Sequence, residues 1–400
     1  MTTTRTTGAA RPRLMRTLNE QLLLERMRGN GPVSRSELAE SSGLSKPTVA
    51  LALAGLERDA LVQHAGRTSG GRGRSAQLYE LRRDAGFVLG LDIGREFVRG
   101  AIADLGGALR ARESRPARSS SGVARVRELA ALADGLLADA GVDRAETLLQ
   151  TVVGSPGIVE PDGRALQLAP NLPGWERPAV LRDLRRLLGA ETTIENDVDA
   201  ATVAEREHGH GRDVSTFAFV SVGTGIGMGL FLDGKLHRGA HGAAGEIAFL
   251  PLADGGLDPR EARRRGALES IASSAAVVRA ARRAGTPFRS ARSVFAAAEA
   301  GDDRAREIVA REATVVALAL ASVIAVVDPQ LIVLGGGIGR APGFAEEVGR
   351  ELAQRSPVVP DIRPSALGED AVVDGCLAIG SEQLWELVLN SRLGPGGPAG

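Results

Sequence analysis

The chain has 400 residues, of which 43% are hydrophobic and 24% are charged, and its single cysteine is Cys376. One hydrophobic core rarely serves more than about 300 residues, so the length predicts more than one domain. A lone cysteine excludes an intramolecular disulfide and a cysteine cage for a metal ion, and this favours a reducing, cytoplasmic compartment.

Charge is distributed unevenly along the chain, although the formal net charge is zero. Residues 1–84 contain fourteen Lys and Arg against eight Asp and Glu, so residues 85–400 carry the compensating negative charge. A basic first segment ahead of an acidic remainder predicts that the first segment meets a polyanion such as DNA. The first residues lack the apolar core of a signal peptide, and the apolar run 313–327 is shorter than the ~20 residues of a membrane span. We therefore expect a buried helix there and no membrane partner.

The N-terminal segment predicts three helices. From Leu14 onwards, apolar residues recur at helical spacing up to Met27, and the pattern stops at residues 29–32. Ser34 and Glu37 form a capping-box pattern that begins a second helix. Ser45 is the expected N-cap of a third helix, whose inward-facing residues are Val49, Leu53 and Leu56.

Two short helices across a glycine-bearing turn are typical of a helix-turn-helix, whose second helix enters the major groove of DNA. The residues expected to face DNA there are Ser45, Lys46, Pro47, Thr48 and Leu51. Two expected strands, 61–64 and 77–81, flank a basic glycine-rich tip, which predicts a wing. Its candidate contacts to phosphates or to the minor groove are Arg67, Arg72 and Arg74. The alternative is a solvated linker whose charges only add solubility.

After Phe87 the pattern changes to alternating strands and helices. The expected strands are 87–94, 97–103, 109–113, 148–154, 192–195, 216–222, 226–232 and 331–334; the expected helices are 123–140, 179–188, 198–208, 260–285 and 302–327. An opening meander followed by helices and strands, repeated once, predicts two similar α/β lobes with a cleft for a small ligand between them.

The most informative motif spans residues 221–246. It holds Gly223, Thr224, Gly225 and Gly227 between two expected strands and continues to Gly245-Glu246. Such a turn exposes backbone amides that can approach a phosphate, beside a threonine hydroxyl. Through this motif the chain resembles the ROK family, which groups sugar-dependent repressors with bacterial sugar kinases. The resemblance runs across roughly residues 14–390 and implies a two-lobed α/β actin-like ATPase fold behind a winged helix-turn-helix.

The resemblance also implies a sugar site. In family kinases, residues that match Asn196 and Asp197 grip sugar hydroxyls, and the aspartate acts as general base on the hydroxyl that is phosphorylated. The remaining expected sugar contacts are Asn171, Glu246 and Glu269. The family's motif histidine is replaced by Phe249, and its zinc-binding cysteines are missing, so we expect neither a metal ion nor a cofactor.

The expected phosphate-binding loops are only partly kept. Asp92 and Gly94 resemble the first phosphate loop, but Arg95 and Glu96 follow where family kinases carry a glycine and a threonine. A carboxylate at that position repels a triphosphate. Gly336, in a run of three glycines, resembles the loop on the adenosine side. We expect no catalytic turnover.

The sequence thus predicts a flexible segment (1–13), a winged helix-turn-helix (14–84), a ROK sugar-kinase-like domain (85–390) and a disordered tail (391–400). Within the large domain, lobe one covers about 85–200 with a helix at about 374–390, and lobe two covers about 201–373. The favoured function is a homodimeric or tetrameric repressor that binds operator DNA and responds to a sugar or sugar phosphate. Two alternatives stay open: an ATP-dependent sugar kinase with an accessory DNA-binding segment, and a regulator whose cleft receives a partner protein.

Overall fold

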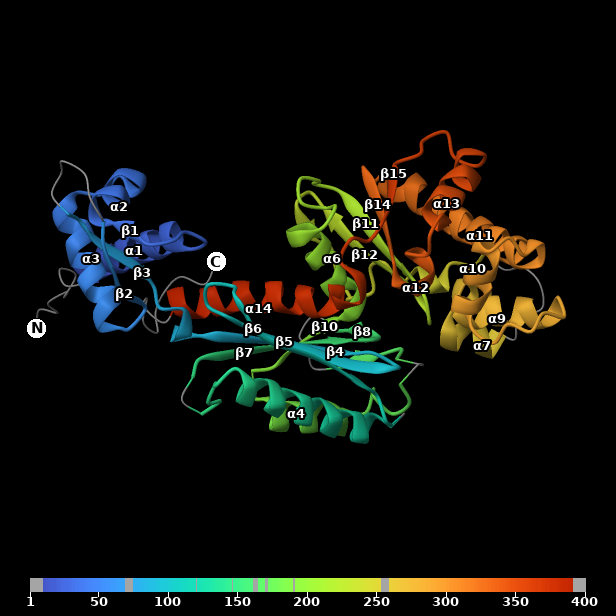
Figure 1. The fold of residues 1–400 in the computed structure, drawn as a ribbon, viewed down its shortest axis with the longest axis horizontal. Coiled ribbons are helices and arrows are strands. Elements are labelled where there is room, and N and C mark those ends of the chain that lie inside the picture. The colour runs from blue at the N-terminus through green and yellow to red at the C-terminus, as the bar shows by residue number, and fades with distance from the viewer. Residues whose placement is uncertain are drawn as a thin grey trace, which may run out of the picture.

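Three bodies follow one another in the computed structural model (Figure 1). The structure describes residues 10–68, 75–119, 121–145, 147–160, 165–169, 172–189, 191–252 and 259–390. An N-terminal unit lies at one end of the long axis, a first α/β lobe lies in the middle, and a second α/β lobe lies at the other end.

The N-terminal unit consists of three helices and a small antiparallel sheet. The helices are α1 (Ala10–Met27), α2 (Arg35–Ser42) and α3 (Lys46–Arg58), and the sheet has the order β1 (Val33–Ser34), β3 (Gln77–Leu81), β2 (Val62–Arg67). The predicted caps are confirmed. Ser34 Oγ accepts from the Glu37 amide at 3.3 Å, Glu37 Oε2 accepts from the Ser34 amide at 2.7 Å, and Ser45 Oγ accepts from the Thr48 amide at 3.3 Å. The sequence did not predict β1, which pairs with β3 beside the start of α2.

The first lobe is a mixed five-stranded sheet in the order β10-β7-β4-β5-β6. Its strands are β4 (Phe87–Ile93), β5 (Phe97–Asp104), β6 (Leu109–Pro116), β7 (Leu149–Ser155) and β10 (Thr193–Asn196). The first three form the expected meander, and β7 and β10 add in parallel. Helices α4 (Gly122–Asp139) and α5 (Pro178–Leu188) share a hydrophobic core with this sheet. A small ribbon of β8 (Ile158–Val159) and β9 (Leu166–Gln167) follows β7.

The second lobe repeats this plan with the order β13-β12-β11-β14-β15. Its strands are β11 (Phe217–Val222), β12 (Ile226–Leu232), β13 (Lys235–Leu236), β14 (Leu331–Gly335) and β15 (Asp361–Pro364). Its helices are α7 (Pro259–Arg265), α8 (Ala267–Ile271), α9 (Ser274–Arg283), α10 (Ala291–Glu299), α11 (Asp303–Val327), α12 (Gly336–Gly339) and α13 (Phe344–Ala353). The prediction of two similar α/β lobes is confirmed.

Two helices form the layer between the lobes. Helix α14 (Ala371–Asn390) packs on β4 and β7 of the first sheet, α6 (Asp197–His208) packs on β11 and β12 of the second, and the two helices pack on each other (Figure 1). A Cβ added to Gly375 of α14 would lie 1.8 Å from the carbonyl oxygen of Ala200 in α6. The helices therefore approach more closely than any residue with a side chain permits at this point.

The expected single helix over 260–285 is wrong. The segment contains α7, α8 and α9 instead. Gly266 separates the first two with a φ of 90°, and the Ser273 side chain caps the start of α9. A left-handed glycine and a new N-cap both interrupt a helical pattern that the apolar spacing alone could not distinguish from one continuous helix.

Helix α11 is long and apolar enough to cross a membrane by length and composition, but half of its most apolar window is buried inside the second lobe. Val316 and Leu320 are fully buried in the core of that lobe. The expected buried helix over 313–327 is therefore confirmed.

The N-terminal unit packs against the far end of α14. Leu23 and Met27 of α1 belong to one buried cluster with Leu384 and Trp385 of α14. Arg28 forms an ion pair with Glu382 and places its guanidinium over the Trp385 ring, 5.2 Å from the centroid. Helix α14 thus contacts the N-terminal unit at one end and the junction between the lobes at the other.

Candidate functional site

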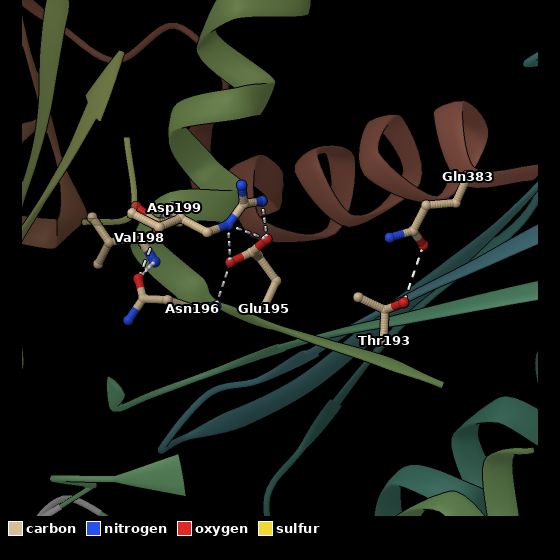
Figure 2. A network of polar contacts seen from close by, with 7 residues as sticks. Thr193, Glu195, Asn196, Val198, Asp199 and Gln383 are labelled. Atoms are coloured by element: carbon tan, nitrogen blue, oxygen red, sulfur yellow. Dashed lines mark hydrogen bonds and ion pairs between the residues drawn. The ribbon is translucent and has the colours of Figure 1, made fainter. Parts of the chain in front are cut away.

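The lobe junction is built on the end of β10 and the start of α6. Asn196 is the N-cap of α6: its Oδ1 accepts from the amides of Val198 at 2.8 Å and Asp199 at 3.0 Å (Figure 2). Its Nδ2 donates to the carbonyl oxygen of Gly157 at 3.0 Å. The side chain is engaged at both ends, so Asn196 ties the turn between β7 and β8 to the start of α6.

Asp197 is the first residue of α6 and lies at the centre of the expected sugar site. Its Oδ1 accepts from the Val198 amide at 2.9 Å, and its side chain is partly exposed. Burial raises the pKa of Asp197 to about 7, and the negative charges of Asp92 and Glu246 add to this effect. A carboxyl group that titrates near neutral pH is suited to accept a proton from a hydroxyl.

A cluster that the sequence did not predict lies beside these two residues. Arg238, in the loop after β13, binds the Glu195 carboxylate through Nε at 3.2 and 3.1 Å and through Nη2. This ion pair crosses from the second lobe to β10 of the first. The buried Asp199 carboxyl has its pKa raised to about 8 by burial and by the charge of Glu195, while Arg238 opposes the shift. The sequence indicated this ion pair only through the positions of its members, because Glu195 directly precedes Asn196 and Arg238 lies inside the glycine-rich motif.

Glu246 and Glu269, two of the expected sugar contacts, lie near each other in the second lobe. Burial raises the pKa of Glu246, and the charge of Glu269 raises it further. Glu269 Oε2 accepts from the Ile226 amide at 3.3 Å, so this carboxylate is positioned by the start of β12. Phe249, which replaces the family histidine, is partly buried against the core of the second lobe.

The glycine turns of the second lobe lie together. The Gly223 amide donates to the Gly225 carbonyl at 2.9 Å, and Thr224 at the tip is exposed. A Cβ on Gly223 would lie 3.4 Å from the Gly337 amide nitrogen, and one on Gly336 would lie 2.4 Å from the Val222 carbonyl oxygen. The two turns therefore meet backbone to backbone, and the third expected glycine of the motif, Gly227, faces Val198 of α6.

The matching loop of the first lobe is occupied by ion pairs. Arg99 contacts the buried Asp92 carboxylate at 3.3 Å and Glu369 at 2.7 Å; Glu369 lies in the short 3-10 helix Gly368–Asp370 ahead of α14. Burial raises the pKa of Asp92 to about 6, and the charge of Arg99 opposes the shift. Asp92 thus already has an ion-pair partner within the chain.

Arg125 of α4 holds the turn after Asp92. Its guanidinium donates to the carbonyl oxygens of Gly94, Arg95 and Ser119 while its side chain is almost fully buried. The side chains of Arg95 and Glu96 point into solvent. The sequence did not predict the role of Arg125, because an arginine on a helix reads as a surface residue.

The expected DNA contacts lie on the N-terminal unit, far along the chain from this site. Ser45, Lys46 and Pro47 are exposed, and Leu51 keeps 53% of its surface on the outer face of α3. Thr48 is partly buried, and its hydroxyl lies 2.8 Å from Ser45 Oγ. Arg67 ends β2 and donates to Ser75 at 3.1 and 3.2 Å. Asn171, Arg72 and Arg74 lie outside the described residues.

Comparison with known proteins decides the family. The model of the ROK family matches residues 88–383. The chain belongs to the ROK family. An N-acetylmannosamine kinase of Salmonella heidelberg is 34% identical over 70% of this chain and 92% of its own length. The bifunctional enzyme NanE/NanK of Brucella suis is 39% identical over 48% of this chain, which spans about a third (35%) of that relative's length.

Other ROK relatives extend over the N-terminal unit as well. The xylose repressor of Caldicellulosiruptor bescii is 26% identical over 92% of this chain and 96% of its own length. The crystal structure of a ROK transcriptional regulator, a homologue of the E. coli MLC protein, superposes with a TM-score of 0.73 at 23% identity and covers 96% of this chain. The ROK hexokinase of Thermus thermophilus, at 29% identity and a TM-score of 0.62, covers 75%. The expected two-lobed α/β fold behind N-terminal helices is therefore confirmed, and the family contains both repressors and kinases.

Proposed function

We propose that this chain is a DNA-binding transcription regulator, controlled by a sugar or sugar phosphate bound at the lobe junction. The observation that carries the proposal is the N-terminal unit and its packing against α14. The xylose repressor matches the chain across this unit, whereas the N-acetylmannosamine kinase and the hexokinase cover 70% and 75% of the chain. A sugar kinase has no evident use for such a unit.

In this proposal, residues 14–84 act as a winged helix-turn-helix. Helix α3 presents Lys46 and Leu51 to the major groove, and the β2–β3 hairpin, with Arg67 in the last strand pair before its tip, reaches phosphates or the minor groove. Two such units in a homodimer or tetramer then read a pseudo-palindromic operator.

The effector closes the two lobes, and α14 carries the change to the N-terminal unit. Asn196, Asp197, Glu246 and Glu269 are the proposed sugar contacts, since carboxylates and amides accept hydrogen bonds from hydroxyl groups. Helix α14 packs on α6, whose first residues are Asp197 and its neighbours, and its other end shares a core with α1. An effector changes DNA binding only if it prefers one of the two lobe arrangements.

The decisive experiment is fluorescence anisotropy of the protein on DNA from upstream of its own gene, at fixed salt, with a panel of sugars and sugar phosphates. We expect sequence-selective binding that one sugar weakens. Lys46→Ala should weaken binding and lower the salt slope by about one, because one cation at the DNA surface is lost. The control is Lys235→Ala, which removes the exposed lysine of β13 in the second lobe. Absence of selective binding under every condition contradicts the proposal.

The effector site is tested separately by calorimetry with the sugar that the anisotropy panel identifies. Asp197→Ala should weaken sugar binding by about 10–100-fold, the usual effect of losing a hydrogen bond to a charged group. Asp183→Ala removes an aspartate from α5 whose one ion pair among the described residues is with Arg186, and it should leave sugar affinity unchanged.

A second candidate function is an ATP-dependent sugar kinase. Asp197, with a pKa of about 7, and the two adjoining glycine turns favour it. The exposed Glu96 and the ion pair of Arg99 with Asp92 oppose it. Sugar-dependent ADP formation that disappears in Asp197→Ala would establish the kinase. We expect none.

A further inference from the structure

The second lobe carries an arginine surface that the proposed function does not use. Between residues 279 and 292 the chain contains five arginines and neither aspartate nor glutamate. They are Arg279, Arg282, Arg283, Arg289 and Arg292, and all five are exposed. We call these five residues the arginine corner. The negative net charge of residues 85–400 makes this concentration the more unusual, because it runs against the balance of the domain that bears it.

Topology brings the five residues to one corner of the lobe. Arg279, Arg282 and Arg283 are spaced i, i+3 and i+4 on α9, so they lie on neighbouring positions of its surface. The chain then turns through residues 284–290, and Arg292 lies in the first turn of α10. Helices α9 and α10 pack on each other at the end of the molecule opposite the N-terminal unit (Figure 1).

The corner lacks charge compensation within the part of the chain that the structure describes. Arg282, Arg283, Arg289 and Arg292 form no ion pair there and no side-chain hydrogen bond. Arg279 donates to the Ser270 carbonyl oxygen and lies within electrostatic range of the buried Glu312. Arg292 also stands at the N-terminus of α10, where the helix dipole disfavours a positive charge. Arg282 and Arg283 lie in the last turn of α9, where the dipole favours a positive charge, so Arg292 is the member of the corner that its helix end disfavours. A bound polyanion would relieve the mutual repulsion of these neighbouring cations.

The chemistry of the corner selects the class of polyanion. None of the exposed large apolar side chains of the described residues lies between 259 and 299. An amphipathic helix that lies in a membrane interface carries such side chains beside its basic residues, and a protein interface has an apolar core. Guanidinium groups without apolar neighbours suit the phosphates of a nucleic acid backbone, which dominate affinity without reading sequence.

We propose that the arginine corner is a second DNA-binding surface, which contacts the phosphates of duplex DNA outside the operator without sequence preference. The identity of the polyanion rests on the proposed function, because a chain that already binds an operator meets duplex DNA continuously. Such a surface raises the affinity for long DNA over that for the bare operator.

The test compares two matched double variants of the full chain. Arg282→Ala/Arg292→Ala removes two arginines of the corner. Arg127→Ala/Arg182→Ala removes two exposed arginines from α4 and α5 of the first lobe, which likewise form no ion pair among the described residues. Both are measured on a mixed-sequence duplex of about 60 base pairs, and on the shortest operator duplex, as the salt concentration is varied. The slope of log affinity against log salt changes by about 0.9 for each phosphate contact in B-DNA.

We expect the corner variant to have a salt slope on the long duplex that is lower than that of wild type by about two. Its salt slope on the short operator duplex should equal that of wild type. The control variant should behave as wild type on both duplexes. Equal slopes for the two variants on the long duplex would overturn the proposal. Binding to vesicles of anionic lipid is measured as well. The proposal is also overturned if the corner variant loses affinity for these vesicles and binds DNA as wild type does. If wild type binds the long duplex but no operator, the function proposed above fails while the corner is still tested on the long duplex.

Discussion

At the scale of single residues, the lobe junction is distinguished by carboxyl groups whose charges interact. Asp92, Asp197, Asp199 and Glu246 all have raised pKa values, because burial disfavours the ionised form of each. Two arginines counter this charge, and each is already bound to a carboxylate: Arg99 to Asp92 and Arg238 to Glu195.

The pKa of Asp197 leads to a prediction on pH. Sugar hydroxyls donate to the ionised carboxylate, and a group with a pKa of about 7 ionises as the pH rises through that value. Sugar affinity should therefore increase about tenfold between pH 6 and pH 8. Asp197→Asn should bind weakly and with a flat profile across this range, whereas Asp183→Asn should keep the wild-type profile. Calorimetry at both pH values measures this, and a flat wild-type profile would contradict the assignment of Asp197.

Glu312 supplies a second prediction, on stability. It is buried in α11, its Oε1 has no hydrogen-bond partner among the described residues, and burial raises its pKa to about 8. The unfolded chain ionises this group near its ordinary pKa of 4.5 and the folded chain only near 8, so unfolding releases a proton between these values. Stability therefore falls as the pH rises through that window, by up to about 1.4 kcal/mol per pH unit.

Glu312→Gln removes the titration while keeping the shape of the side chain. The melting temperature of the variant relative to wild type should rise steadily from pH 5 to pH 8. Glu307→Gln, at an exposed position of the same helix, should show no such trend. Differential scanning calorimetry checks both, and parallel profiles for wild type and Glu312→Gln would sink the idea.

Residues that match the family motif were predicted from the sequence. Residues whose partners lie far away in the sequence were not. Asn196 and Asp197 follow a strand and match the family pattern, so their position was predictable. Arg238 pairs with Glu195 over a separation of 43 residues, and Arg125 reaches the Gly94 carbonyl over 31. No local pattern encodes such partners, because they depend on how the lobes and helices pack.

At the scale of elements, helix ends were predictable where a side chain of the same segment makes the cap. Ser34, Glu37 and Ser45 are of this kind. The break at Gly266 was not, because its left-handed conformation fits against another segment: a Cβ there would lie 2.1 Å from the Ala248 carbonyl oxygen. A glycine inside an otherwise helical pattern carries no local sign of such a neighbour.

Two helix glycines give a matched prediction on packing. Gly375→Ala in α14 should destabilise the protein by about 1–3 kcal/mol, because the new methyl group meets the Ala200 carbonyl of α6. Gly349 of α13 has no atom within 4 Å of its Cβ position, so Gly349→Ala should stabilise by about 0.5–1 kcal/mol through helix propensity alone. Urea unfolding of the two variants measures the difference. The close approach of α6 and α14 would be refuted if both substitutions stabilised the protein.

At the scale of the whole molecule, α14 is the one described element that joins three parts. It packs on the first sheet, on α6 beside the candidate sugar residues, and on α1 of the N-terminal unit. Thr193 of β10 also donates to Gln383 of α14 at 3.1 Å, three residues from the end of the strand that carries Asn196 (Figure 2). A movement of the second lobe relative to the first therefore acts on α14 through α6, and α14 in turn contacts α1.

This arrangement predicts reciprocal coupling that depends on the contact between α1 and α14. If sugar weakens operator binding by some factor, saturating operator must weaken sugar binding by the same factor.

Trp385, of which 3% is exposed, should be needed for the coupling and not for either affinity alone. We expect Trp385→Ala to bring the factor close to one while sugar affinity stays at the wild-type value. Losing a buried tryptophan typically costs about 3–5 kcal/mol of stability, so Arg28→Ala is the milder second variant. It removes the guanidinium over the same ring and the ion pair with Glu382. Leu387→Ala, at a position of α14 that is 47% exposed, should keep the wild-type coupling factor.

The coupling factor is measured twice: by anisotropy on operator DNA with and without sugar, and by calorimetry of sugar binding with and without operator. An undiminished factor in Trp385→Ala and Arg28→Ala would show that the signal reaches the N-terminal unit by a route other than α14.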